Sequence, residues 1–424
     1  MELKKYKLGD LLEVTRGMSL PGQFYSETGT LIRLTLGNFN MNGGGFKENT
    51  SKTDLYFTGP VKEEYILQEG DIITPLTEQS LGLLGTTAKI PESGKYIQSQ
   101  DVALVKCKEG LIDPNFCYYL ISSNLVRQQL SAAAQQTKIR HTSPDKIKDC
   151  TVWVPDLENQ KRIGRIFADI DSKITLNCQI NDNLEAMAKQ LYDFWFVQFD
   201  FPNEEGKLYK SSGGKMVWNE NLKREIPEGW DCMCIGDYAK CKGGYAFKSK
   251  DFTSKGTPVI KIGNIQEDYT LNMVDSQCIN DFDNSLFIAR KYDLVIAMTG
   301  ATIGKFAISP KEYLVNQRVG RFDLGKSPLG RLGYLFNSLK QEYFREQVFQ
   351  IASGCAQPNI SSEQIDSIVV LKPKMSVLKN FNQLCEPILE QQVENILQIE
   401  LLTKQRDDLL PLLMNGQVSP LNSD

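Results

Sequence analysis

Few residues in this chain could support catalysis. The chain has 424 residues but a single histidine, His141, which removes most zinc sites and most histidine-based acid–base mechanisms. Cys232, Cys234 and Cys241 are potential metal ligands, but their spacing fits no usual zinc pattern. Alternation along a strand explains the first pair more simply. The sequence therefore predicts no metal site.

Motifs that bind nucleotides or methyl donors are also missing. The segment 82–85 is too short for a phosphate-binding loop, and no G-x-x-x-x-G-K-[ST] motif occurs. The chain lacks an Asn/Asp-Pro-Pro-aromatic motif and a Gly-rich strand–turn–helix with an acidic partner, so we find no S-adenosylmethionine pocket. We expect a chain that is not an enzyme and holds no cofactor.

Basic residues gather in two segments that could contact nucleic-acid phosphates. Residues 238–262 include six lysines and one aspartate, with Tyr245 among them. In the first half, Lys138, Arg140 and His141 form a smaller cluster before a predicted strand. For any single residue, an ordinary solvated surface charge stays the alternative. For the longer segment as a whole, the pattern favours DNA binding. The net charge of −4 argues against general nucleic-acid binding but leaves local patches open.

The overall composition indicates a protein of two or more domains. A chain of this length is too long for one core, and 41% hydrophobic with 24% charged residues is ordinary for a globular protein. No apolar run reaches 18 residues, and the N-terminal segment has no apolar signal core. Ten scattered cysteines without a disulfide-like framework suggest reduced thiols. We therefore expect a cytoplasmic protein without a membrane span.

Two long helices must position these segments, because one heptad pattern occurs twice at an offset of 218 positions, as from Ile170 to Ile388. An asparagine falls at the same place in both helices, and such a polar residue would fix the register of a helix pair. We expect the two helices to pack antiparallel, although two amphipathic helices in separate cores remain the alternative. The expected seam residues are Ile163, Phe167, Ile170, Ile174, Asn177, Leu184 and Leu191 in the first helix, and Phe381, Ile388, Asn395, Leu402 and Leu409 in the second.

The segments before the two helices repeat each other too. Residues 262–265 correspond to 36–39, and residues 365–373 correspond to 147–155. We expect a helix at 111–130 and strands at 147–155 and 365–373. The predicted organisation is a first domain at 1–156, a spacer helix at 157–199, a connector at 200–230, a second domain at 231–373, a second spacer helix at 374–418 and a tail at 419–424.

At this point the sequence resembles the specificity subunit of type I restriction–modification systems, and the resemblance covers nearly the whole chain. Similar phrases are the Gly-Asn-Ile turn at 263–265, the Thr-Gly-x-Thr-Ile-Gly-Lys loop at 299–305 and the Ser-Gly-x-x-Gln-x-x-Ile-Ser stretch at 353–361. A strand ending in proline before the helix, at 365–373, is a fourth. The first half departs from the pattern, because residues 77–82 replace the tight Thr-Gly loop.

The resemblance implies an α+β fold of two target-recognition domains, each followed by a long helix, with the helices packed as an antiparallel coiled coil. It implies a non-catalytic subunit that binds a bipartite, asymmetric site in double-stranded DNA. Two modification subunits and the restriction subunits would be its partners, and S-adenosylmethionine and ATP with Mg would bind to those partners. The residues expected to contact DNA are Arg33, Asn38, Thr77, Gln79, Lys138, Arg140, His141, Lys242, Tyr245, Lys248, Lys261, Asn264, Thr299, Lys305, Gln357 and Asn359.

Three further hypotheses concern function and contacts. The chain could be a coiled-coil scaffold that binds no DNA, or the recognition part of a single-chain restriction–modification enzyme. The aromatic run Tyr192, Phe194, Trp195 and Phe196 could contact a partner subunit, or it could close the core at the end of the first helix.

Overall fold

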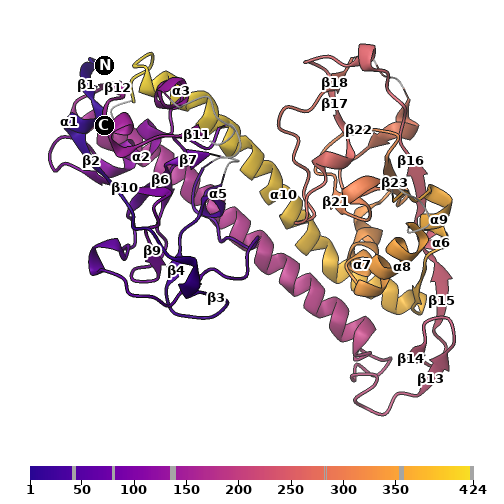
Figure 1. The fold of residues 1–424 in the computed structure, drawn as a ribbon. Coiled ribbons are helices and arrows are strands. Elements are labelled where there is room, and N and C mark those ends of the chain that lie inside the picture. Colours follow the sequence, from indigo (N-terminus) through magenta and orange to yellow (C-terminus); the bar gives the residue numbers. More distant parts are fainter. Residues whose placement is uncertain are drawn as a thin grey trace. The chain divides into compact units, whose positions relative to one another are not determined.

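The computed structural model describes residues 1–40, 44–78, 82–133, 140–280, 282, 284–352 and 358–420. It divides into two compact units, one formed by Met1–Thr175 with Glu400–Asp424 and the other by Leu176–Ile399. Each long helix therefore contributes one part to each unit (Figure 1). The domain boundaries expected from the sequence remain predictions.

The first unit combines short strands with four helices that precede the first long helix (Figure 1). Its helices are α1 (Leu8–Leu11), α2 (Pro114–Ile121), α3 (Asn124–Ala133), α4 (Pro144–Lys148) and the start of α5 (Leu157–Tyr192). Its strands are β1 (Lys4–Lys7), β2 (Leu12–Arg16), β3 (Tyr25–Ser26), β4 (Ile32–Arg33), β5 (Tyr56–Phe57), β6 (Ile72–Pro75), β7 (Thr77–Glu78), β8 (Ala88–Lys89), β9 (Tyr96–Ile97), β10 (Val102–Cys107), β11 (Arg140–His141) and β12 (Thr151–Val154).

The central sheet of this unit has the strand order β2-β10-β6-β8, and every pair is antiparallel. Strand β10 is buried on both faces, which explains its continuous apolar sequence. Ala103 and Val105 pack in the cluster that includes α2, while Val102 and Leu104 pack in a separate cluster on the opposite face. The sheet therefore lies between two hydrophobic cores, one packed on each face.

Two sequence predictions in this unit were wrong. The helix expected at 111–130 is two helices, because the hydroxyls of Ser122 and Ser123 donate to carbonyl groups of the preceding turn and end α2. The strand expected at 147–155 is only β12. It follows α4, which Ser143 caps by accepting from the Lys146 N–H at 3.2 Å, with Pro144 in the first helical position.

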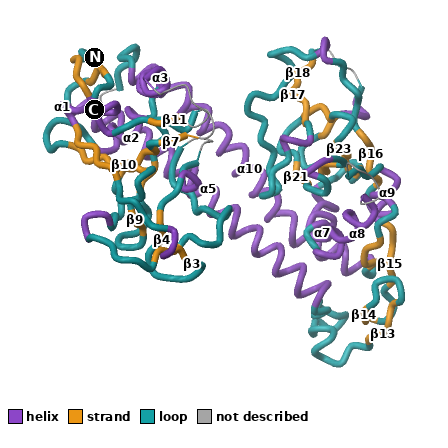
Figure 2. The backbone as a smooth tube through the Cα atoms, viewed as in Figure 1, coloured by secondary structure: helices purple, strands orange, loops and turns teal. Residues whose placement is uncertain are grey.

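The second unit repeats this topology (Figure 2). Its helices are α6 (Ile235–Tyr238), α7 (Leu329–Leu339), α8 (Glu342–Ala352), α9 (Ser362–Asp366) and most of α10 (Met375–Met414). Its strands are β13 (Met216–Asn219), β14 (Arg224–Pro227), β15 (Asp231–Cys234), β16 (Lys240–Gly243), β17 (Thr257–Ile260), β18 (Cys278–Ile279), β19 (Ile288–Ala289), β20 (Leu294–Ala297), β21 (Phe306–Ile308), β22 (Tyr313–Val315), β23 (Val319–Asp323) and β24 (Val369–Lys372).

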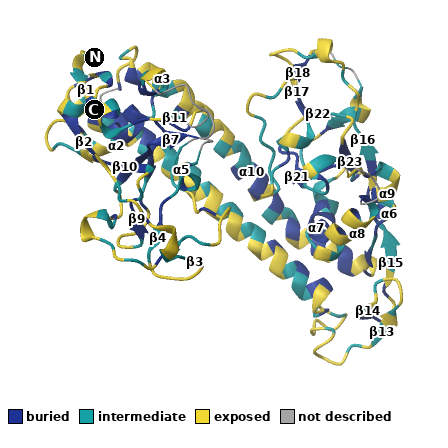
Figure 3. Cartoon of the chain, in the orientation of Figure 1, coloured by how far each residue is buried: buried dark blue, intermediate teal, exposed yellow. Residues whose placement is uncertain are grey.

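The central sheet of the second unit, β16-β23-β20-β21, matches the central sheet of the first unit strand for strand. The parallel pair β17–β22 matches β4–β9, and the antiparallel pair β15–β24 matches β1–β12. The buried residues lie on these sheets and on the helices beside them, such as α2 and α7 (Figure 3). The repeated α+β fold is therefore confirmed, although the strand expected at 365–373 is again shortened by a helix, α9.

The connector is more ordered than its sequence indicates. It contains the antiparallel hairpin β13–β14, in which Ile226 is buried and Trp218 is 58% exposed. Phe199, Phe201 and Trp230 bring the connector into the main core of the second unit. The hairpin is apolar on one face only, and Gly- and Ser-rich segments flank it. Both features make its strand pattern hard to detect in the sequence.

The two long helices pack antiparallel, as expected. In the first unit, Arg406 of α10 forms an ion pair with Asp171 of α5 at 3.0 Å, and Leu413 packs in the same core as Ile163. In the second unit, Asn181 contacts Asn395, and the ring centroids of Tyr192 and Phe381 lie 6.0 Å apart. In both units, the numbers of the contacting residues increase along α5 as they decrease along α10, so the two helices run antiparallel.

All twelve expected seam positions are at least half buried. Ile163, Phe167, Phe381 and Asn395 are buried, while Ile170, Ile174, Asn177, Leu184, Leu191, Ile388, Leu402 and Leu409 are intermediate. The helix α5 continues into a π-helical turn, Asp193–Val197. Among the described residues, no helix is long and apolar enough to cross a membrane.

Candidate nucleic-acid interface

A close crossing of two loops defines one edge of the central sheet in the second unit. The Gly244 N–H donates to the Val319 carbonyl at 3.0 Å, and a Cβ at Gly244 would lie 2.2 Å from the Asn316 carbonyl oxygen. Only glycine permits this approach. The next residue, Tyr245, bridges to Asn316 and accepts from the Gln317 N–H at 2.9 Å. The crossing holds Tyr245 at the sheet edge, where it is 41% exposed.

Two further loops meet at the same edge. Thr299 bridges antiparallel to Asn359, and its hydroxyl donates to the Pro358 carbonyl at 3.2 Å. The Met298 N–H donates to the Arg318 carbonyl at 3.0 Å, and the Arg318 guanidinium lies 3.5 Å from the side-chain oxygen of Asn359. Arg318 and Asn359 are both exposed, so their remaining donors and acceptors face solvent. Our sequence interpretation missed Arg318.

Aromatic and basic side chains continue this surface toward β17. The ring of Tyr245 packs against Phe247 and Phe282 at centroid distances of 5.0 and 5.2 Å. Lys248, Lys250 and Lys255 are exposed and form no ion pair with any described residue. The candidate interface of the second half is the set Tyr245, Lys248, Lys250, Lys255, Thr299, Gln317, Arg318 and Asn359.

Three other predicted lysines are engaged within the protein. Lys242 pairs with Asp323 at 2.6 Å, and this hydrogen bond holds the pKa of that carboxyl group below its usual range. Lys305 pairs with an acidic neighbour at 3.1 Å, and the Lys261 ammonium lies 4.2 Å from the centroid of an aromatic ring. Exposed ion pairs exchange readily, so these lysines are secondary candidates for phosphate contacts.

Two of the predicted asparagines, Asn38 and Asn264, have structural roles. Asn38, which is buried, accepts from the Thr35 N–H at 2.9 Å and donates to the Lys47 carbonyl at 3.2 Å. Asn264 makes the equivalent two hydrogen bonds, each at 2.7 Å. The Gly-Asn phrase therefore closes a short 3₁₀ turn after a strand in each half, which gives it a reason to recur without contacting DNA.

In the first half, the predicted residues Thr77, Arg140 and His141 meet across the β7–β11 pair. Thr77 lies opposite His141, and Glu78 lies opposite Arg140. The Glu78 carboxylate is buried, pairs with Arg140 at 3.0 Å and accepts two backbone N–H groups at 3.1 Å. Glu78 therefore organises this loop, a role our sequence interpretation missed. His141 is exposed, whereas Thr77 is buried.

Arg33 lies apart from these residues and is 6% exposed. Its guanidinium pairs with Asp54 at 3.0 Å and stacks 3.8 Å from the centroid of the Tyr25 ring. These contacts favour a structural role. The predictions for Gln79, Lys138 and Gln357 lie outside the described residues.

The first half builds the same sheet edge with different side chains. A Cβ at Gly17 would lie 2.3 Å from facing carbonyl oxygens, and Met18 bridges to Ser99 as Tyr245 bridges to its partner. The Leu76 N–H donates to the Asp101 carbonyl at 2.8 Å, so Asp101 takes the place of Arg318. The two halves share one frame and differ in charge at its edge.

A separate hollow of about 590 Å³ lies at the end of α5 in the second unit. Met187, Leu191 and Phe194 line it together with Ile388 of α10. The other members of the aromatic run, Tyr192, Trp195 and Phe196, are buried in the core. Those three residues therefore close the core at the end of the helix, while Phe194 remains a candidate contact for a partner.

Comparison with known proteins agrees with this architecture. The family model described as the type I restriction modification DNA specificity domain matches residues 1–186 and 227–395. The chain is similar to the type I restriction enzyme MjaIX specificity subunit of Methanocaldococcus jannaschii, at 23% identity over 319 residues, covering 73% of this chain and 70% of that protein.

Two further matches extend over most of the chain. The type I restriction enzyme HindI specificity subunit of Haemophilus influenzae is 22% identical over 377 residues, which cover 76% of this chain and 81% of that protein. The crystal structure of the type I restriction–modification S subunit from M. genitalium aligns with a TM-score of 0.60 at 16% identity, covering 98% of this chain and 96% of that one. The structural match shows that the folds are alike.

Proposed function

Because the chain belongs to the type I restriction modification DNA specificity family and is its non-catalytic DNA target specificity subunit, we propose that its halves recognise the two parts of a bipartite, asymmetric DNA site. The observation that carries this proposal is the paired sheet edge. Gly17 and Gly244 force the same loop crossing in both halves, while Met18 and Asp101 in one half replace Tyr245 and Arg318 in the other. One frame with different side chains suits the recognition of different bases.

In the second half, Arg318 and Asn359 are the proposed base-contacting residues. A guanidinium can bind the acceptors of guanine, and a side-chain amide can bind adenine through one donor and one acceptor. Lys248, Lys250 and Lys255 would neutralise phosphates, which position the domain without selecting a sequence. In the first half, His141 and Met18 are the proposed base-contacting residues, with Arg140 and the buried carboxylate of Glu78 holding the loop in place.

The proposed partners are two modification subunits and, in the full complex, restriction subunits. S-adenosylmethionine and ATP with Mg would bind to those partners. The hollow lined by Met187, Leu191, Phe194 and Ile388 is the proposed contact for a modification subunit, because its apolar side chains are left half exposed at the end of the helix pair. A cytoplasmic location completes the proposal.

Methylome sequencing tests the two-part recognition directly. A host would carry this gene with its modification-subunit gene, either unchanged or with residues 6–155 replaced by the equivalent domain of a relative. We expect the exchange to alter one part of the methylated motif and to leave the other unchanged. If both parts changed together, the halves would not be independent recognition domains.

Point variants test the proposed residues. Arg318→Ala should relax the motif at one position, with a loss of discrimination of about 10- to 100-fold for one bidentate contact. Lys250→Ala should weaken DNA binding for all sequences alike and reduce its salt dependence. Lys242→Ala, which removes a lysine already paired with Asp323, is the matched comparison and should have a smaller effect. A complex that neither shifts DNA nor methylates it would favour the scaffold hypothesis instead.

A further inference from the structure

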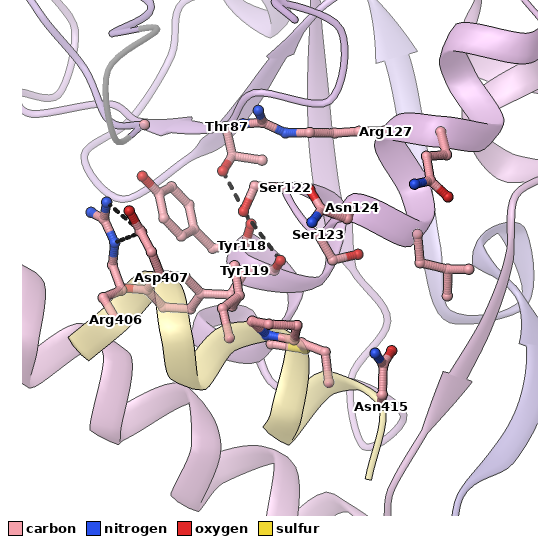
Figure 4. A pocket seen from close by; sticks show the side chains of 16 residues that line it. Thr87, Tyr118, Tyr119, Ser122, Ser123, Asn124, Arg127, Arg406, Asp407 and Asn415 are labelled. Carbon is pink, nitrogen blue, oxygen red and sulfur yellow. Dashed lines mark hydrogen bonds and ion pairs between the residues drawn. The ribbon is translucent and has the colours of Figure 1, made fainter. Parts of the chain in front are cut away.

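A hollow of about 540 Å³ opens in the first unit between α2, α3 and the last turns of α10 (Figure 4). Tyr118 and Leu125 line it from the first-domain helices, and Leu410 and Met414 line it from α10. Arg127 reaches along its upper side (Figure 4). The proposed DNA contacts lie elsewhere, so this hollow has no role in the function described above.

The second repeat provides an internal reference for this hollow. The sequence offset of 218 that relates the two long helices also relates their neighbours. Gln129 donates to the Thr151 carbonyl at 2.9 Å and accepts from its N–H at 2.8 Å. At the corresponding positions, Gln347 makes the same pair of bonds with Val369, both at 3.3 Å. The two helix layers can therefore be compared residue by residue.

At the equivalent place, the second unit is filled with aromatic rings. The correspondences are Leu125 to Tyr343, Leu410 to Tyr192 and Met414 to Phe196. Tyr192 and Phe196 are almost fully buried, with ring centroids 5.0 Å apart, and burial raises the pKa of Tyr343. Two aliphatic side chains and a methionine leave this volume empty in the first unit. The hollow therefore lies where the second repeat carries three aromatic residues.

A cationic group accompanies this empty volume. The Arg127 Nε is buried, and among the described residues it has no hydrogen-bond partner. Arg127 also forms no ion pair with a described residue, and burial lowers its pKa. The acidic residue on the rim, Asp407, is paired with Arg406 at 2.9 Å and forms no ion pair with Arg127, although its charge partly offsets the effect of burial on the Arg127 pKa. A buried, unpaired guanidinium donor favours a ligand with an anionic acceptor.

We propose that this hollow binds a partner polypeptide through a terminal aromatic residue, whose ring replaces the missing rings and whose carboxylate pairs with Arg127. The ring would pack against Tyr118, Leu410 and Met414, as the second unit packs its own rings at the equivalent place. The carboxylate would pair with the guanidinium of Arg127, which lines the hollow and forms no ion pair with a described residue. The site is independent of DNA recognition and of the apolar hollow lined by Phe194.

Ligand-observed NMR with the purified full-length chain tests the proposal. The probe is the peptide Gly-Ser-Gly-Ser-Tyr with a free carboxyl terminus. We expect it to bind, its amidated form to bind about tenfold more weakly, as for the loss of one charge-assisted hydrogen bond, and Gly-Ser-Gly-Ser-Gly not to bind. The free acid 4-hydroxyphenylacetate should bind more weakly than the peptide. Equal binding of the amidated peptide, or tighter binding of the free acid, would overturn the proposal.

Variants locate the binding. Leu125→Tyr/Leu410→Tyr fills the hollow as the second repeat is filled and should abolish peptide binding, while thermal denaturation reports whether it folds. Arg127→Gln should weaken binding about tenfold and does not depend on the first variant. Arg345→Gln changes the equivalent arginine of the second repeat and should leave binding unchanged. If Arg127→Gln and Arg345→Gln bind the peptide as the wild type does, the proposed site is wrong.

Discussion

The ion pair between Arg406 and Asp171 has no counterpart in the second repeat. Arg406 is 8% exposed, and Tyr119 donates to the same carboxylate at 2.6 Å. At the positions of Arg406 and Asp171, the second repeat has Ala188 and Leu389, both fully buried. Burying charges costs desolvation that their attraction only partly offsets. The same position of the helix pair is therefore occupied by polar residues in the first unit and by apolar residues in the second.

Introducing the apolar residues of the second repeat into the first unit should distinguish two quantities. One is the loss of stability when the ion pair is broken, and the other is the net contribution of the pair to stability. Arg406→Ala should lower the free energy of unfolding by about 2 kcal/mol, less than for a fully buried pair because the Asp171 side chain is 30% exposed. The triple variant Tyr119→Phe/Asp171→Leu/Arg406→Ala should recover most of this loss. Urea denaturation measures both. A triple variant less stable than Arg406→Ala would show that the ion pair stabilises the fold outright.

Lys340 places a cation in the core of the second unit. Its side chain is 5% exposed, and its ammonium lies 3.1 Å from Glu185 of α5 and 4.1 and 4.5 Å from the ring centroids of Phe336 and Tyr269. The contact with Glu185 has the distance of an ion pair but not the geometry of a hydrogen bond. Burial outweighs these contacts and lowers the pKa of Lys340 to about 8, with Lys189 on α5 adding to the lowering.

The stability of the protein should therefore depend on pH through Lys340. Between pH 8 and 10.5, the unfolded chain keeps the Lys340 proton that the folded chain has lost, so the free energy of unfolding rises with pH in this window. Relative to Lys340→Met, the wild type should gain about 2–3 kcal/mol on going from pH 7 to 10. Chemical denaturation at several pH values measures this. Lys62→Met, which changes a 78%-exposed lysine of the first unit, is the control and should show no such trend. A constant difference between wild type and Lys340→Met would contradict the assignment.

Within the helix pair, a group of amides replaces apolar packing. Asn395, which is 2% exposed, donates to the Asn181 side-chain oxygen and accepts from Gln391, both at 2.8 Å. Gln392 donates to the Asn181 backbone carbonyl at 3.3 Å. Asn177, the other asparagine expected in the seam, bonds to the exposed Gln398 at 3.2 Å. The two asparagines that match in sequence therefore differ in environment, one buried and one near solvent.

This difference changes the expected effect of removing each asparagine. Asn395→Leu should destabilise the protein by about 1–2 kcal/mol, because it leaves the Asn181 amide oxygen without its donor. Asn177→Leu should be nearly neutral, since water can replace the lost bond. The double variant Asn181→Leu/Asn395→Leu removes both partners and should be more stable than Asn395→Leu alone. The free energies of unfolding of the wild type, Asn181→Leu, Asn395→Leu and their double variant form a double-mutant cycle, and a coupling energy near zero would show that the amides do not act together.

The long elements were predictable from sequence because each carries a periodic signal over many residues. The heptad pattern spans five repeats in each helix, and tertiary packing agrees with it. Short elements such as β7 and β11 carry only two residues each, too few for any period, and they exist because Glu78 binds Arg140 across them. The break at Ser122 depends on local hydroxyl bonds that compete with a helical period.

The candidate interface was only partly predictable for the same physical reason. Tyr245 and Asn359 lie in segments with recognisable composition. Arg318 lies in a short turn between β22 and β23, and only the fold brings it to Thr299 and Asn359. Conversely, Asn264 matched a family phrase but bonds only to its own loop. Sequence composition identified where charge accumulates, while backbone geometry decides which side chains remain free to contact a ligand.

At the scale of the whole molecule, the helix pair is the proposed ruler between the two parts of the DNA site. Deleting 172–178 from α5 and the facing 398–404 from α10 keeps the heptad phase and shortens the pair by about 10 Å. The gap in the methylated motif should shrink by about three base pairs, at about 3.4 Å each, with both parts unchanged. Methylome sequencing of this variant measures the gap.

A four-residue deletion provides the control for the spacer. Removing 172–175 and 401–404 breaks the heptad phase and should destabilise the fold, visible as a lower melting temperature. A stable seven-residue variant that still methylates the original spacing would show that the helices do not set the distance. Loss of methylation in a variant that folds would leave the change in DNA twist as the dominant effect, and a compensating seven-residue insertion at the same places should then restore the original motif.

The four tryptophans differ in exposure, and the two buried ones both lie in the second unit. Trp195 and Trp230 are 5% and 6% exposed in the aromatic core of the second unit, whereas Trp153 of the first unit is 41% exposed and Trp218 of the connector is 58% exposed. Indole emission shifts to longer wavelength only when a buried ring becomes hydrated. The wavelength of intrinsic fluorescence will therefore report the unfolding of the second unit and change little when the first unit unfolds. Unfolding of the first unit has to be followed by circular dichroism of its backbone.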